Sequence, residues 1–114
     1  MSDSLSAEDR KLITLARATR ARTGAAEGAA VRDSAGRTYA AATVDLPSLQ
    51  VSALGVCVAM AVASGSSGLE AAVLLTGAES VSEADLAALR DLGGTGVEVH
   101  RGDVRGTLAE TTRT

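Results

Sequence analysis

The segment Gln50–Gly65, QVSALGVCVAMAVASG, constrains the fold more than any other part of the chain. Apart from Ser52, Gly55 and Ser64, its side chains are almost all apolar, so a helix here has no polar face to turn toward water. The apolar run is too short and too interrupted to span a bilayer, which takes about 20 predominantly apolar residues. We therefore expect a central helix that is buried on nearly every side, by a sheet and by neighbouring subunits.

The composition indicates an unusual core. The chain has 114 residues, with one Tyr and neither Phe nor Trp, and we expect a single domain over residues 1–114. Aromatic side chains normally bury the largest area per residue, so Ala, Val and Leu must form the core here. Such a monomer is only marginally stable, and association with further copies is the expected remedy.

Charge and cysteine content bear on partners and compartment. The formal net charge is −3, and there is one cysteine. Mild acidity is unfavourable for binding nucleic acid, which needs clustered cations. A single cysteine forms no intramolecular disulfide, which suits a reducing compartment. The first residues lack the pattern of a secretory signal, so we expect a cytoplasmic protein without a membrane partner.

Local patterns predict an alternation of helices and strands. Ser6 with Asp9, and Ser82 with Asp85, are capping pairs that begin the first and last helices. Pro47 is expected to end the second strand and lead into the central helix. The predicted elements are a helix at about 7–22, strands at 26–32 and 37–44 joined by a tight turn, the central helix, a strand at 69–76, a helix at 84–92 and a strand at 96–100. The order is α-β-β-α-β-α-β, with residues 1–5 and about 104–114 flexible.

Several short motifs, taken in order, resemble those of the small zinc-dependent cytidine deaminases. Gly28-Ala29-Ala30-Val31 matches part of the family's first strand, and Asp33–Tyr39 looks like its Asp-Gly-x-x-Tyr hairpin. Thr43-Val44-Asp45-Leu46 lines up with the family's Asn-x-Glu-Asn, and Ala61–Gly65 is similar to the end of its central helix. The likeness runs from about residue 12 to 100. It implies a three-layer α/β fold with a mixed β-sheet and helices on both faces.

The family's chemistry falls on positions where this chain has other residues. Those enzymes hold zinc with a Cys or His at the start of the central helix and two Cys in Pro-Cys-x-x-Cys at the start of the next, and a Glu two residues after the first ligand moves protons. The first motif aligns with Ser52-Ala53-Leu54, and the second falls near Ser80–Asp85. The alignment therefore predicts no catalytic residue, no metal ligand and no cofactor.

Other candidate residues are few. In the family two residues bind the ribose of the nucleoside. Thr43 and Asp45 align with them, so they are the candidate substrate-binding residues for a nucleoside or nucleotide. The only thiol, Cys57, lies in the middle of the central helix and is expected to be a small buried apolar residue. The only imidazole, His100, is expected to be solvated or paired with backbone.

Three functions stay open. The first is a non-catalytic cytidine-deaminase-like protein that works as a homo-oligomer or binds a partner, because family members assemble through these helices and Ala59, Ala61 and Ala63 allow close contact. The alternative is a nucleoside (cytidine) deaminase or related hydrolase with unrecognised or partner-supplied metal ligands. The third is an RNA- or ribosome-associated adaptor that uses the basic first helix, with Arg10, Arg17, Arg20 and Arg22.

Overall fold

The computed structural model describes residues 5–114, so the predicted flexibility of the first residues lies largely outside the described part. The helices are α1 (Ala7–Thr23), α2 (Ala53–Ala63) and α3 (Glu83–Gly93). The strands are β1 (Gly28–Asp33), β2 (Thr38–Ala42), β3 (Val44–Leu46), β4 (Leu49–Val51), β5 (Leu69–Leu75), β6 (Glu98–Gly102) and β7 (Leu108–Arg113).

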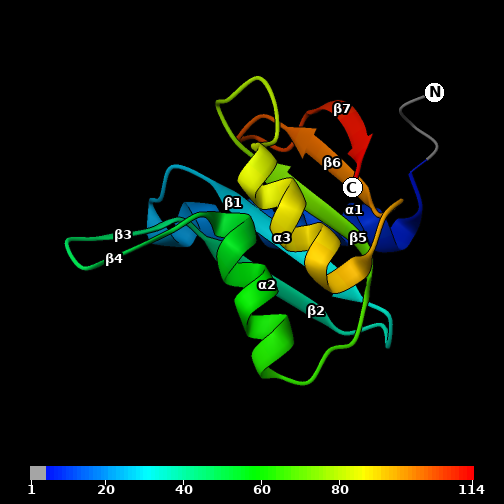
Figure 1. Cartoon of the computed structure of the whole chain (residues 1–114). Helices are drawn as coiled ribbons and strands as arrows, with labels where there is room; N and C mark the ends of the chain where they lie inside the picture. The colour runs from blue at the N-terminus through cyan, green and yellow to red at the C-terminus, as the bar shows by residue number, and fades with distance from the viewer. Residues whose placement is uncertain (1–4) are drawn as a thin grey trace.

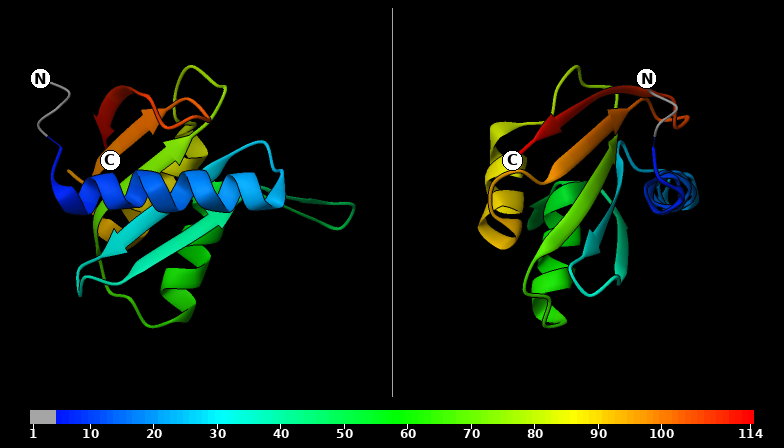
Figure 2. Two further views of the ribbon diagram at one scale, coloured as in Figure 1. Left: turned by 180° about the vertical axis from the view of Figure 1, so that it is seen from behind. Right: turned by 90° about the vertical axis from the view of Figure 1, so that its right-hand side faces the viewer.

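The architecture has three layers (Figure 1). A five-stranded sheet has the order β2-β1-β5-β6-β7, in which only β5 and β6 are parallel. Helix α1 covers one face of this sheet, and α2 and α3 cover the other (Figure 2). The predicted three-layer α/β fold with a mixed sheet is confirmed.

Alternating side chains on β1 serve two separate cores. Ala29 and Val31 pack with α2 and α3, whereas Ala30 packs under α1. The small residues let α1 lie very close to the sheet, because a Cβ placed on Gly28 would be 2.3 Å from the carbonyl oxygen of Ala16. This close approach explains why the first strand begins with glycine.

The C-terminal segment differs from the expectation. Residues 104–114 were predicted to be loose, but Leu108–Arg113 forms β7, antiparallel to β6 at the edge of the sheet. An edge strand with a solvated face can be polar, and the Thr residues that suggested disorder also favour extended backbone. The prediction was therefore wrong because composition alone does not separate the two states.

The segment before α2 also differs. Pro47 was predicted to lead into the central helix, yet it lies in the turn of a hairpin in which β3 pairs with β4 and Leu46 is opposite Leu49. Proline at a tight turn fits its fixed backbone angle. The hairpin projects from the body of the molecule (Figure 1), and the element order becomes α-β-β-β-β-α-β-α-β-β.

Helix α2 has one face packed against the sheet and one face that the single chain leaves uncovered. Leu54, Cys57 and Ala61 are buried against the sheet, but Ala59 is exposed and Val62 is 55% exposed. In the single chain the sheet covers one face of α2 as predicted, and cover of the other face by neighbouring subunits stays a prediction. Within residues 5–114 no helix has the length and hydropathy needed to cross a membrane.

Candidate functional site

The starts of α2 and α3 lie side by side and carry the residues that align with the family's zinc motifs. Ser52 caps α2 and accepts a hydrogen bond from the Gly55 amide at 3.0 Å. Ser82 caps α3 and accepts one from the Asp85 amide at 3.1 Å. Across the helices, Ser52 Oγ donates to Asp85 Oδ1 at 2.6 Å. A continuous hydrogen-bonded chain therefore joins the two helix starts.

We call Ser52 and Asp85 the helix clamp, because their hydrogen bond joins the starts of α2 and α3. Asp85 is buried. A carboxylate that is ionised accepts strong, short hydrogen bonds. The position of Asp85 in the first turn of α3 also places negative charge at the positive end of the helix dipole. The Ser52 hydroxyl both donates and accepts here, so its hydrogen-bonding capacity is largely used.

These residues do not fit a zinc ion. A catalytic zinc takes about three protein ligands of nitrogen, thiolate or carboxylate type. Of Ser52, Ser82 and Asp85, only Asp85 supplies such a group. Leu54, at the position of the family's proton-transferring Glu, is fully buried in the core and has no proton to move.

The predicted substrate-binding residues occupy different surroundings. Thr43 Oγ1 accepts a hydrogen bond from the Glu27 amide at 3.0 Å, while Glu27 Oε2 accepts one from Thr76 Oγ1 at 2.7 Å. Asp45 is exposed on β3, opposite Gln50. Thr43 thus has a structural partner already, and binding of a nucleoside by Thr43 and Asp45 stays a prediction.

Cys57 behaves as predicted. Its side chain is fully buried, and its sulfur lies 3.6 Å from the carbonyl oxygen of Tyr39. Burial raises the pKa of the Cys57 thiol to about 12. A thiol that stays protonated is a poor nucleophile and a poor metal ligand.

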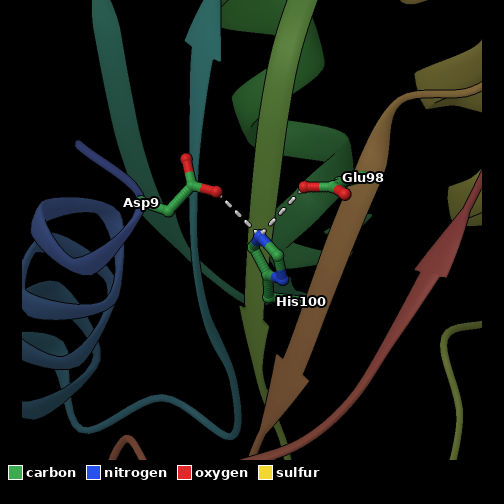
Figure 3. A group of neighbouring side chains, drawn as sticks. All are labelled: Asp9, Glu98 and His100. Atoms are coloured by element: carbon green, nitrogen blue, oxygen red, sulfur yellow. Dashed lines mark hydrogen bonds and ion pairs between the residues drawn. The ribbon is translucent and has the colours of Figure 1, made fainter. Parts of the chain in front are cut away.

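A second group of chemically capable residues lies on the α1 face of the sheet. His100 on β6 is only 2% exposed, and its Nε2 lies 2.9 Å from Asp9 Oδ2 of α1 and 3.9 Å from Glu98 Oε1 (Figure 3). Its other ring nitrogen, Nδ1, lies 2.8 Å from Thr111 Oγ1. The expectation that His100 is solvated or paired with backbone was wrong, because α1 and β7 cover it.

Arginines hold the other ends of the carboxylates in this group. Arg32 Nη2 lies 3.0 Å from Asp9 Oδ1, and Arg32 Nε lies 2.7 Å from Glu70. Arg113 Nη2 lies 2.9 Å from Glu98 Oε2. Burial raises the pKa of Asp9, but neighbouring His100 and Arg32 outweigh burial and hold that pKa below its ordinary value.

A cavity of about 760 Å³ adjoins the group. Asp9, Arg32, Glu98, His100 and Thr111 contribute to its lining. The cavity volume is within the range of small-molecule sites. Sequence reasoning missed this region because Asp9 and His100 are far apart in the chain and meet only through the packing of α1 on the sheet.

The family and the fold of this chain can be compared with those of known proteins. A family model described as cytidine deaminase-like matches residues 5–106. The chain belongs to the cytidine deaminase-like family. The predicted resemblance is therefore confirmed. A comparison with curated proteins gave no match.

Solved structures of cytidine deaminases share the fold of this family member. The enzyme from Burkholderia pseudomallei has a TM-score of 0.79 at 20% identity, covering 95% of this chain and 92% of that one. The enzyme from Mycobacterium leprae has a TM-score of 0.74 at 18% identity, covering 95% and 94%. That from Mycobacterium tuberculosis has a TM-score of 0.71 at 21% identity, covering 82% and 85%. At these identities the likeness concerns the fold alone.

Proposed function

We propose that this chain is a non-catalytic member of the cytidine deaminase-like family, acting as a homo-oligomer or as a partner-binding protein. The observation that carries the proposal is the hydrogen bond between Ser52 and Asp85 at the two helix starts. It occupies the place where the resemblance puts the zinc ligands of the enzymes.

Each component of zinc-dependent deamination lacks a suitable residue at that place. A hydroxyl and a single carboxylate do not make a set of three zinc ligands. Leu54 supplies no acid or base to move a proton between water and the pyrimidine ring. The surviving contacts stabilise the junction of α2 and α3, so the fold persists without the chemistry.

Cytidine deamination is the second candidate, because the similar solved structures are of cytidine deaminases. Formation of uridine from cytidine distinguishes the two candidates. The proposal predicts no uridine above the level without protein, also after addition of Zn²⁺. Uridine formed by the wild-type chain and lost in Asp85→Asn would contradict it.

Exposed apolar side chains at two places on the chain support self-association. Val62 of α2 is 55% exposed, and Leu46 and Leu49 at the tip of the β3–β4 hairpin are 56% and 53% exposed. Ala59 and Ala63 beside Val62 are small and exposed, which permits close approach of another helix. A second copy of the chain, which supplies the same apolar helix face, is the occupant that we propose.

Sedimentation tests this assembly. Val62→Glu places a charge on the exposed face of α2 and is expected to shift the sedimenting species toward the monomer. Ala18→Glu, at an exposed position of α1 on the other side of the sheet, is the control and leaves the species unchanged. A wild-type chain that sediments as a monomer, or a Val62→Glu variant that sediments like wild type, would contradict association through α2.

A further inference from the structure

We propose that Asp9, Glu98 and His100 form a binding site for a divalent transition-metal ion, Zn²⁺. The ligand atoms are Asp9 Oδ2, Glu98 Oε1 and His100 Nε2, which lie within 4.8 Å of one another. The site lies where α1, which carries Asp9, packs on β6, which carries Glu98 and His100 (Figure 3). It departs from the sequence-based expectation that the chain binds no metal.

The orientation of the two carboxylates supports the assignment. In each, one oxygen is held by an arginine and the other faces His100. Asp9 Oδ1 lies by Arg32 and Oδ2 by the ring, while Glu98 Oε2 lies by Arg113 and Oε1 faces the ring. Outer contacts that hold ligating carboxylates in place are typical of metal sites.

The His100 ring alone does not satisfy both inner oxygens, and solvent reaches the Glu98 side chain, which is 41% exposed. The Nε2 atom of His100 carries at most one hydrogen, and Asp9 Oδ2 at 2.9 Å takes it. Glu98 Oε1, at 3.9 Å, is too far for a hydrogen bond to the same atom. A cation placed among the three atoms binds both oxygens and the ring nitrogen together.

The separations suit zinc. With zinc about 2.0 to 2.2 Å from nitrogen and oxygen ligands, tetrahedral coordination puts ligand atoms about 3.4 Å apart. The observed 2.9 and 3.9 Å lie on either side of this value. The two carboxylate oxygens lie within 4.8 Å of each other, so the carboxylates of Asp9 and Glu98 must rotate toward each other to admit the ion.

Thr111 supports the ring state that a metal requires once zinc displaces the Nε2 hydrogen that Asp9 Oδ2 accepts in the metal-free chain. Its hydroxyl oxygen lies 2.8 Å from His100 Nδ1 and can accept that nitrogen's hydrogen. The neutral ring then presents the Nε2 lone pair to the ion, as in other metal sites where the second nitrogen is hydrogen-bonded. The two guanidinium groups of Arg32 and Arg113 pair with three carboxylates, because Glu70 also binds Arg32.

Buried polar atoms beside the three metal ligands leave hydrogen-bonding capacity for a fourth ligand of the metal, water or a small anion. Within residues 5–114, Asp9 Oδ1 and Arg32 Nη1 are buried without a hydrogen-bond partner, although Asp9 Oδ1 keeps its ion pair with Arg32 Nη2. Both residues line the cavity, and the Asp9 side chain is only 9% exposed. Such buried atoms are rare in folded proteins. The cavity also leaves room for a fourth metal ligand, either water or a small anionic molecule, which is the pattern of open zinc sites.

Calorimetric titration of metal-free wild-type protein with ZnCl₂ tests the site. We expect one ion per chain. Co²⁺ should give the visible absorption of a tetrahedral ion with nitrogen and oxygen ligands and no thiolate band, because Cys57 is buried. His100→Ala and Glu98→Gln should each weaken zinc binding by at least about tenfold. Glu98 is partly exposed, so Glu98→Gln tests the ligand with little risk to folding.

Two controls separate this site from the helix starts. Glu110→Gln changes a carboxylate that lines the same cavity outside the ligand set, and Ser52→Ala with Asp85→Asn changes the helix clamp. Both should bind zinc as wild type does. No zinc uptake by the folded wild-type chain, or unchanged uptake in both His100→Ala and Glu98→Gln, would overturn the proposal. Uridine formation lost in Asp85→Asn would instead overturn the proposed function and leave this site standing.

Discussion

The two faces of the sheet differ in how their polar side chains are arranged. At the starts of α2 and α3, Asp85 is engaged by the Ser52 hydroxyl, which itself caps a helix. On the α1 face, two carboxylates and His100 converge beside a cavity, and each carboxylate keeps one oxygen turned toward the ring. In our proposals the α1 face, and not the place that aligns with the family's zinc ligands, therefore provides the metal-binding capacity.

The largest effect is expected from Asp9→Ala. Removing Asp9 leaves buried His100 without its hydrogen-bond partner at Nε2 and Arg32 with Glu70 as its remaining carboxylate, which costs about 3 to 5 kcal/mol of unfolding free energy. Urea denaturation measures the loss. Asp45→Ala, at an exposed position of β3, is the control and should change stability by no more than about 0.5 kcal/mol. Equal stability of the two variants would mean that the α1-face group is not coupled to folding.

Ser52→Ala should come next, at about 1 to 3 kcal/mol. The substitution removes the cap of α2 and also leaves the buried Asp85 Oδ1 without its hydrogen-bond donor. Thermal unfolding followed by circular dichroism gives the comparison with wild type. A variant as stable as wild type would contradict a stabilising role for the hydrogen bond between Ser52 and Asp85.

Ser82→Ala isolates the capping contribution. Ser82 caps α3 but has no contact across to α2 among the hydrogen bonds of this junction. We expect a loss of about 1 kcal/mol, smaller than for Ser52→Ala. The same thermal measurement decides, and a larger loss for Ser82→Ala would reverse the assigned roles of the two serines.

The smallest effect concerns acid. The pKa of Asp9 is lower in the folded chain than its ordinary value of 3.8, so the unfolded state binds the proton more readily. The stabilisation is therefore complete above about pH 4 and is lost as the pH falls through the lowered value. Urea midpoints measured between pH 5 and pH 2 should fall less in Asp9→Asn than in wild type. Parallel curves for the two chains would contradict this contribution.

The sequence was informative wherever local chemistry decides structure. The Ser-x-x-Asp pairs at Ser6 and Ser82 begin helices as predicted, and the apolar run of β5 occupies the buried centre of the sheet. The β3–β4 hairpin and β7 were missed because a proline turn and a Thr-rich edge strand carry weak local signals.

The α1-face group required information that local patterns do not contain. Asp9 was identified only as a helix-capping residue, and His100 only as a solvated or backbone-paired side chain. Their contact depends on how α1 crosses the sheet and on a strand, β7, that the sequence did not reveal. The adaptor function proposed for the basic face of α1 stays a prediction, with Arg17 already bonded to the carbonyl oxygen of Arg105.

The contrast between the two faces can be tested most directly by locating zinc in a crystal of the full chain soaked in ZnCl₂. Anomalous scattering at the zinc absorption edge identifies the ion without reference to activity. We expect a peak beside His100 Nε2 and none between Ser52 and Asp85. A peak at the helix starts, with none beside His100, would contradict this expectation.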